Sequence, residues 1–281
     1  MTKTIGLIIT VFMLTINLGF TEERMTRQPH QRDTFETTLT IVYDNNPFVQ
    51  GLKTAWGFAC VAEVDSTMIL FDTGGDGKIL LENMKKLDID PTRIDVVIIS
   101  HNHHDHIGGL DSFLKVKPDR VVYIPKSFPP KVSEQIKGAG ATPVRVESAQ
   151  YILTNVYTLC DYGSSIPEQS MVLKTDPGLV VVTGCAHPGI ANILMKIHTV
   201  FPKEQIYLVL GGFHLGGASN HELAEIIHTF RELNVKKVAP CHCTGDHAMK
   251  SFQKEFGDDF IPTGVGGMFE IIPDKRMEED K

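Results

Sequence analysis

Four histidines and an aspartate lie within six consecutive residues, directly after an apolar run. The chain has 12 histidines, and His101, His103, His104 and His106 stand with Asp105 in the stretch DVVIISHNHHDHIGGL. Neutral imidazole and carboxylate are ligands that zinc and similar metals prefer. Imidazoles this close would repel one another if charged, whereas a metal turns the crowding into coordination. The chain must therefore fold so that an apolar strand delivers this segment to a metal site.

The spacing within the segment separates its ligands. Residues two apart project to the same side of an extended chain, so His101 and His103 can bind one ion. Asp105 and His106, on the turn into a following helix, can face a second ion. His104 falls out of this phase, and we expect its side chain to point away. The segment thus predicts a binuclear site that leaves His104 outside.

The remaining chain alternates between strand-like and helix-like stretches. Predicted strands span residues 38–43, 57–64, 68–71, 96–100, 121–124, 151–159, 170–174, 179–183, 205–211 and 237–241. Predicted helices span residues 77–87, 110–117, 130–138, 189–201, 220–233 and 247–256, with Asn220 as the N-cap of the fifth. Because no linker or internal repeat divides this part of the sequence, we predict one α/β domain over residues 35–281.

The N-terminal segment has a composition of its own. Lys3 precedes an uncharged apolar run from Ile5 to Phe20. The run fits the apolar region of a signal peptide, about 7–15 residues, better than a full membrane span of about 20. The cleavage pattern is poor, so an uncleaved anchor stays open. We expect residues 1–24 to be a signal peptide or N-terminal anchor and residues 25–34 a polar tether, in an exported (periplasmic or secreted) or membrane-anchored protein.

The charge and motif content of the sequence limits which classes of binding partner and substrate are expected. Lys and Arg number 27 against 34 Asp and Glu, a net charge of −7, and no basic cluster occurs. Nucleic acid is therefore not an expected partner, and membrane contact is expected only through the N-terminal segment. Serine-nucleophile, P-loop and dinucleotide-binding motifs are absent from the sequence. The partner that remains to be expected is a small-molecule substrate bound at a metal site.

The H-x-H-x-D-H string resembles the metal-binding motif of the metallo-β-lactamase superfamily of hydrolases. The upstream stretch MILFDTGGD also matches, and the similarity spans residues 38–272. The combination SHNHHDHIGGL, VVVTGCAHPGI, LVLGGFHL and PCHCTG resembles the branch of ribofuranosylaminobenzene-phosphate synthase-like and dihydropteroate-synthase-like members. The resemblance implies an α/β fold, a four-layer αββα sandwich, with two metal ions bridged by a hydroxide at one edge.

The same resemblance implies which residues bind metal. His101 and His103 match the ligands of the first metal, and Asp105 and His106 match those of the second. His242, in KKVAPCHCTG at the end of a late strand, matches the final histidine motif.

The middle of the chain departs from the superfamily pattern. Where most members carry a metal-bridging aspartate, the strand LVVVTG leads into Cys185, and His187 follows. In one alternative, His187 completes the first site, and Cys185 is a ligand of the second metal or a small buried residue. In the other, Glu168 takes the usual histidine position, as in iron-binding members. We favour His187, because it and Cys185 are two apart on one strand exit and can both face the metals.

Three further residues have candidate roles. His214 ends the apolar strand QIYLVLGGFHL. It matches a proton donor of the tRNA-processing and phosphodiesterase branches, which makes it a candidate general acid, an auxiliary ligand or a structural histidine. Asp72 either orients ligand histidines or caps its strand. Lys126 either holds a phosphate or carboxylate of the substrate or is solvated.

Hydrolysis by a metal-bound hydroxide is the chemistry expected of this site, because zinc lowers the pKa of bound water from about 15.7 to about 7. Zinc is the expected cofactor, as one or two ions, with iron or manganese as alternatives. We predict a zinc-dependent hydrolase of an ester, thioester, lactone or phosphodiester-type substrate, with Asp105 and His214 as catalytic residues. The alternatives are a non-catalytic metal-binding protein on the same scaffold and an iron-dependent redox member, which depends on Glu168.

Overall fold

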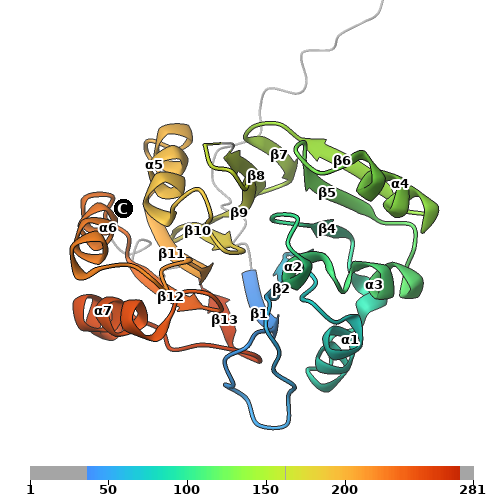
Figure 1. Cartoon of the computed structure of the whole chain (residues 1–281), viewed down its shortest axis with the longest axis horizontal. Coiled ribbons are helices and arrows are strands. Elements are labelled where there is room, and N and C mark those ends of the chain that lie inside the picture. Colours follow the sequence, from blue (N-terminus) through green and yellow to red (C-terminus); the bar gives the residue numbers. More distant parts are fainter. Residues whose placement is uncertain (1–36, 162, 273–281) are drawn as a thin grey trace, which may run out of the picture. The chain divides into compact units, whose positions relative to one another are not determined.

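Two mixed β-sheets face each other in the computed structural model, which describes residues 37–161 and 163–272 (Figure 1). The first sheet has the order β13-β1-β2-β3-β4-β5-β6, and the second has the order β12-β11-β10-β9-β8-β7. The strands are β1 (Thr37–Tyr43), β2 (Ala59–Val64), β3 (Thr67–Phe71), β4 (Val96–Ile98), β5 (Val121–Pro125), β6 (Thr142–Val146), β7 (Gln150–Leu153), β8 (Val156–Asp161), β9 (Glu168–Thr175), β10 (Gly178–Thr183), β11 (Ile206–Gly212), β12 (Lys237–Cys241) and β13 (Met268–Ile271).

Helices cover the outer face of each sheet. Apolar side chains of α1, α3 and α4 pack on the first sheet, and those of α5, α6 and α7 pack on the second. The helices are α1 (Gly77–Lys86), α2 (His104–Ile107), α3 (Leu110–Val116), α4 (Pro130–Gly138), α5 (Ile190–Val200), α6 (Asn220–Glu232) and α7 (Asp246–Phe256), with short 3-10 helices at Pro91–Arg93 and Gly257–Asp259. The layer order is helix, sheet, sheet, helix, which confirms the predicted αββα sandwich.

Central strands such as β4 and β10 are buried along their whole length because both faces of each sheet are covered. In β10, Val180 and Val182 point into the core between the sheets, whereas Val181 packs under the helices of the second sheet. Burial of each such side chain contributes on the order of 1.5–3 kcal/mol. This two-sided packing holds the strand ends rigidly in place, and the site is built on those ends.

Local details differ from the predicted elements. The predicted strand 151–159 is a hairpin of β7 and β8, turned by Asn155 at a φ of 61°. Strands β6 and β13 were not predicted, because their apolar patterns are short. The N-cap of α6 is Ser219 rather than Asn220, since Ser219 forms a capping box with Glu222.

Parallel strands end at a common edge. Strands β3 and β4 are parallel neighbours in the first sheet, as are β10, β11 and β12 in the second. Open sheets of this kind commonly bind ligands beyond the carboxyl ends of their strands. The histidine-rich segment follows β4 and leads into α2. Among the described residues, no helix is long and apolar enough to cross a membrane. The predicted leader and tether, residues 1–34, lie outside the described residues.

Candidate metal centre

The predicted ligands converge at the edge where these parallel strands end. They come from the segment after β4, the loop after β10 and the end of β12. Within each set below, the possible ligand atoms lie within 4.8 Å of one another. The first set is His101, His103 and His187, and the second set is Asp105, His106 and His242. The fold therefore brings together the residues assigned to the two metals from the sequence, with His187 in the first set.

His101 anchors the first set and is completely buried. Its Nδ1 lies 2.9 Å from the Ser100 hydroxyl, which in turn donates to Asp72 at 2.6 Å. Burial, together with the neighbouring imidazoles of His106 and His187, lowers the pKa of His101 below its usual value. Burial and His214 likewise lower the pKa of His187 to about 4. These two imidazoles are thus held neutral, as metal binding requires.

In the second set, neighbouring carboxylates raise the pKa of a histidine, whereas the pKa values of His101 and His187 in the first set are lowered. His106 Nδ1 donates to the Asp72 carboxylate at 2.7 Å, and its Nε2 lies 3.5 Å from Asp105 Oδ2. Burial alone would lower the pKa of His106, but the charge of Asp72 and the hydrogen bonds to both carboxylates raise it to about 10. Burial would raise the pKa of Asp105, but the imidazoles of His106 and His242 that face its carboxylate hold it well below its usual range. Asp72 therefore fixes the ring of His106, the contact expected if it orients a ligand histidine.

Asn45 orients His242 and was not found from the sequence. Its Oδ1 lies 2.7 Å from His242 Nδ1, and its Nδ2 donates to the His242 carbonyl at 3.2 Å. His242 has a φ of 48°, an uncommon conformation for a non-glycine residue. The Nε2 atom of His242 lies 3.4 Å from Asp105 Oδ2. Asn45 holds the backbone and ring of His242 from 197 residues away in the chain, a separation that gives no local signal.

Cys185 lies between the two sets. Its Sγ is 3.3 Å from His106 Nε2, and the possible ligand atoms of Cys185, His106 and His101 all lie within 4.8 Å of one another. A hydrogen bond with Cys243, and then burial, raise the pKa of Cys185 above its usual value. Of the roles open for this residue, the geometry favours a ligand position shared by both sets.

Glu168 holds the loop that carries Cys185 and His187. One carboxylate oxygen accepts from the amides of Gly184, Cys185 and Ala186, at 2.8–3.1 Å, and the other accepts from the amide of His187 at 2.9 Å. Burial raises the pKa of Glu168, and these amide donors oppose the shift. With both oxygens occupied, Glu168 is absent from the ligand groups formed by the described residues. The observed arrangement supports His187 as the ligand and gives Glu168 a structural role.

The other candidates occupy different positions. His104 is exposed and lines a hollow with residues of α4, away from both sets, as the spacing predicted. His214 is exposed, and its ring centre lies 4.3 Å from that of His187. A hydrogen bond with Cys243 raises the pKa of His214. Lys126 forms an ion pair with Glu147 at 2.7 Å.

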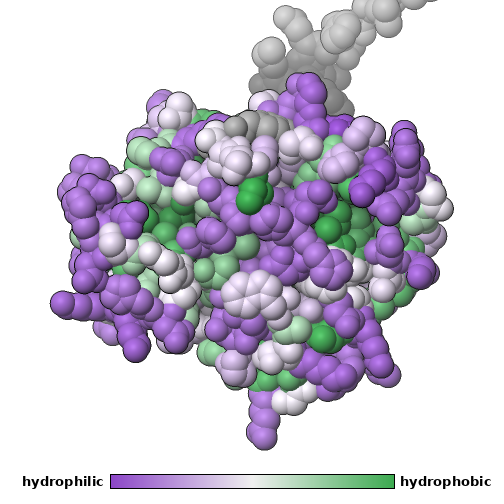
Figure 2. Space-filling model, in the orientation of Figure 1, coloured by the Kyte–Doolittle hydropathy of each residue, from purple (hydrophilic) through white to green (hydrophobic). Residues whose placement is uncertain are grey.

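A pocket of about 680 Å³ opens beside the centre. Trp56 forms one wall, 61% exposed, with its ring centre 5.0 Å from that of His242. The other lining residues are His214, Leu215, Gly216, Gly217, Ala218, Glu222, Glu225, Ile226 and Cys243. In the view of Figure 2, hydrophilic residues gather in the middle of the visible face, and hydrophobic residues show between the helices to either side. The pocket thus combines an apolar wall with two carboxylates.

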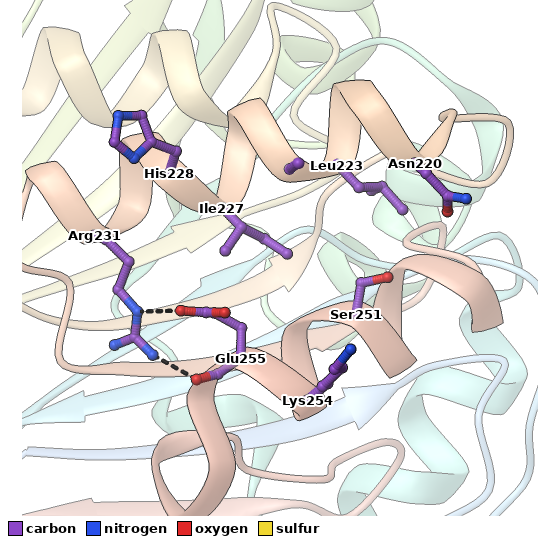
Figure 3. Close-up of a pocket in the computed structure, with 9 residues that line it drawn as sticks. Asn220, Leu223, Ile227, His228, Arg231, Ser251, Lys254 and Glu255 are labelled. Atoms are coloured by element: carbon purple, nitrogen blue, oxygen red, sulfur yellow. Dashed lines mark hydrogen bonds and ion pairs between the residues drawn. The ribbon is translucent and has the colours of Figure 1, made fainter.

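A second groove lies between α6 and α7 (Figure 3). Arg231 crosses it to form an ion pair with Glu255 at 3.0 Å, and Ile227 and Leu223 line its floor. Its lining residues do not belong to any ligand group found in the described part of the chain. We assign it no part in the metal centre.

Three buried imidazole nitrogens indicate that the residues of the two sets fit a metal ion. The Nε2 atoms of His101, His187 and His242 have no hydrogen-bond partner among the described residues. Buried polar atoms are normally satisfied, and leaving one unsatisfied costs about 1–3 kcal/mol. In His101 and His242 the opposite ring nitrogen is held by a polar neighbour, so Nε2 is the atom turned towards the set. The donor set therefore fits a divalent metal.

An αββα sandwich with imidazole and carboxylate sets at one edge defines a class of metalloproteins. The chain belongs to the metallo-beta-lactamase superfamily, whose family model matches residues 59–242. It is 31% identical, over 73% of its length and 86% of the relative, to the 7,8-dihydropterin-6-methyl-4-(beta-D-ribofuranosyl)-aminobenzene-5'-phosphate synthase of Methanocaldococcus jannaschii. This similarity confirms the branch indicated by the motifs.

Solved structures show the same fold. Tm1679, described as a metal-dependent hydrolase of the beta-lactamase superfamily, superposes with a TM-score of 0.72 at 31% identity and covers 84% of this chain and 99% of its own. The metallo-beta-lactamase fold protein YhfI from Bacillus subtilis has a TM-score of 0.63 at 14% identity and covers 84% of this chain and 100% of its own. The second likeness concerns the fold alone.

Proposed function

We propose that this protein is a metal-dependent hydrolase, with zinc as its cofactor, that acts on an ester, thioester or lactone of a small molecule. The observation that carries the proposal is the set of unpartnered Nε2 atoms of His101, His187 and His242 at one edge of a hydrolase-type fold. When bound there, a divalent ion would supply Lewis acidity and would activate water as a nucleophile near neutral pH.

The chain's own residues prepare the site for this chemistry. Asp72 and Asn45 hold the Nδ1 atoms of His106 and His242, which fixes the ring orientation and leaves each Nε2 towards the second set. Asp105 faces both rings with one carboxylate oxygen. The ligands are thereby held in one geometry before an ion or a substrate arrives, and such preorganisation favours catalysis.

The pocket favours an uncharged substrate over a phosphodiester. Its charged lining residues are Glu222 and Glu225, and neither Lys nor Arg is among the residues that line it. Carboxylates repel a phosphate, whereas the face of Trp56 offers a stacking surface for a flat or apolar group. The methanogen relative is named as a synthase of a 5'-phosphate compound. A synthase role with a phosphate-bearing substrate is therefore the second candidate, supported by that similarity and opposed by the charge of the pocket.

A substrate panel tests the proposal. The zinc-loaded full chain is assayed with an aryl ester, a thioester, a lactone and an aryl phosphodiester. We expect turnover of the first three, and we expect His101→Ala to reduce kcat/KM by more than about 100-fold, the upper limit for residues that only support a ligand. His228→Ala, on the exposed face of α6 and outside this pocket, serves as the matched control, with circular dichroism as the check of folding.

Two results would contradict this assignment. Fully metal-loaded protein that turns over none of the substrates would indicate a non-catalytic metal-binding protein. Preferential hydrolysis of the phosphodiester would retain a hydrolase but would overturn the substrate class.

A further inference from the structure

Three residues beyond the two sets lie at matching places in the fold. Strands β10, β11 and β12 are parallel neighbours that end at Thr183, Gly212 and Cys241. Cys185, His214 and Cys243 each follow two residues after one of these ends. Parallel strands bring equivalent positions to the same edge of a sheet, so three separate segments deliver two thiols and one imidazole to one place.

The side chains meet there. The Sγ atoms of Cys185 and Cys243 and a ring nitrogen of His214 lie within 4.8 Å of one another. The Cys243 thiol also points at the Cys185 carbonyl, at 3.8 Å. Tetrahedral ligand atoms at zinc–sulfur and zinc–nitrogen bond lengths lie roughly 3.5–3.8 Å apart. Small side-chain rotations therefore bring these three atoms to bonding distance of one ion.

The backbone is shaped to allow this approach. A Cβ atom at Gly212 would lie 2.7 Å from Cys243 Sγ and would also collide with the Gly184 carbonyl. His214 has a φ of 53°, in the left-handed region that non-glycine residues rarely adopt. Residues held in such conformations cluster at functional sites, because surrounding structure must offset the strain.

We propose that Cys185, Cys243 and His214 form a third, sulfur-rich metal position beside the two nitrogen and oxygen sets. Two thiolates and an imidazole favour a soft or borderline ion such as Zn²⁺ or Cd²⁺ over the hard ions that carboxylates prefer. Cys185 contacts His106 as well as Cys243, so its thiolate links this position to the second set. His214 and Cys243 also line the pocket, which places the third ion at the pocket floor. His214 is then an auxiliary ligand rather than a general acid.

Cobalt spectroscopy tests the proposal without reference to activity. The full chain is stripped of metal and titrated with Co²⁺ alone, and the thiolate-to-cobalt absorption is followed in the near ultraviolet. We expect Cys243→Ser to lower this absorption about two-fold and to reduce the bound metal by one ion per chain, because the position loses one of two thiolates. His214→Ala should also lose that ion. Cys60→Ala, in the core between the sheets, is the control and should leave absorption and stoichiometry unchanged.

A second measurement needs no variant. Metal-stripped wild-type protein is alkylated with and without Cd²⁺, and the modified cysteines are located by peptide mass spectrometry. We expect Cd²⁺ to slow the alkylation of Cys243 at least ten-fold, since a bound thiolate is a poor nucleophile. Equal alkylation with and without Cd²⁺, or cobalt absorption unchanged by Cys243→Ser, would overturn the third position. Either result would leave the hydrolase proposal standing, because that proposal rests on the Nε2 atoms of His101, His187 and His242 rather than on Cys243.

Discussion

The first and second ligand sets share a crowded edge but differ in charge. The first set is three imidazoles, and burial lowers the pKa values of His101 and His187. The second set contains a carboxylate, and Asp72 and Asp105 raise the pKa of His106 to about 10. At neutral pH the first set is ready to receive an ion, whereas the second holds a proton that the ion must displace. Neighbouring carboxylates, rather than burial alone, therefore decide whether a buried histidine carries a proton.

The two sets also depend on different supports. Glu168 holds the loop that carries His187 of the first set, and Asn45 holds His242 of the second. Asp72 supports both sets, because it binds His106 directly and reaches His101 through Ser100. Glu168 and Asn45 belong to separate parts of the chain, so either of these two supports can be perturbed with limited effect on the other set.

Removal of the one carboxylate ligand should have the largest effect. In Asp105→Asn, the amide replaces an anion that both His106 and His242 face, so the second set should lose its ion while the first set keeps its own. We expect kcat/KM to fall by more than about 100-fold, since a ligand is worth more than the groups that support it. Elemental analysis and the ester assay measure the two effects. Full metal content in this variant would contradict the assignment of Asp105.

The pH dependence of metal affinity should separate the sets. His106, with a raised pKa of about 10, is protonated at neutral pH, so each ion bound to the second set releases a proton. Affinity of the second set should therefore rise about 100-fold between about pH 6 and pH 8, one decade per unit for one proton, and level off only above the raised pKa. His187, with a pKa lowered to about 4, is already neutral in that range, and affinity of the first set should change little. Calorimetry in buffers of different ionisation enthalpy measures the protons released, and equal release from both sets would refute the comparison.

Glu168→Gln should disturb the first set. A glutamine has one acceptor oxygen and places an NH₂ group against backbone amides that now donate to a carboxylate. We expect the free energy of unfolding to fall by about 1–3 kcal/mol, the cost of a buried polar group left unsatisfied. Urea denaturation measures this loss, with Glu147→Gln at the surface as the control. An unchanged midpoint would show that the loop does not need this carboxylate.

Asn45→Ala should weaken the second set alone. Without the amide oxygen, His242 loses the partner of its Nδ1 and the fixed orientation of its ring. Loss of such a support reduces metal affinity by about 10-fold or somewhat more. Competition with a chelator measures the affinity of each ion in turn. If both ions weakened equally, the separation of the two supports would be wrong.

His104→Ala should have the smallest effect. The side chain is exposed and faces a hollow beside α4 rather than either set. We expect a change of less than about 0.5 kcal/mol in stability, with the metal content of the wild type. A lost ion in this variant would mean that His104 is a ligand after all.

Much of the site was predictable because ligand chemistry is local. Four of the six residues in the two sets come from one short segment after β4, where residue type and two-residue spacing carry the information. The αββα layers were expected only through the resemblance to the superfamily, whereas the strands themselves show as apolar runs buried on both faces. Whole strands were missed where the apolar pattern is short, as in β6 and β13, and strand boundaries were wrong where a turn interrupts an apolar run, as at Asn155.

Residue types and their order along the chain establish which atoms are available for a metal: imidazoles and a carboxylate at the ends of apolar strands. Which of these atoms meet depends on the tertiary structure. In the folded chain both Glu168 oxygens accept from backbone amides, which leaves His187 as the candidate ligand. Asn45 lies against His242, although 197 residues separate the two in the chain. Cys243 likewise lies beside Cys185 and His214. Such contacts depend on how parallel strands align at the edge of a sheet, and alignment between distant segments leaves no periodic signal in either one.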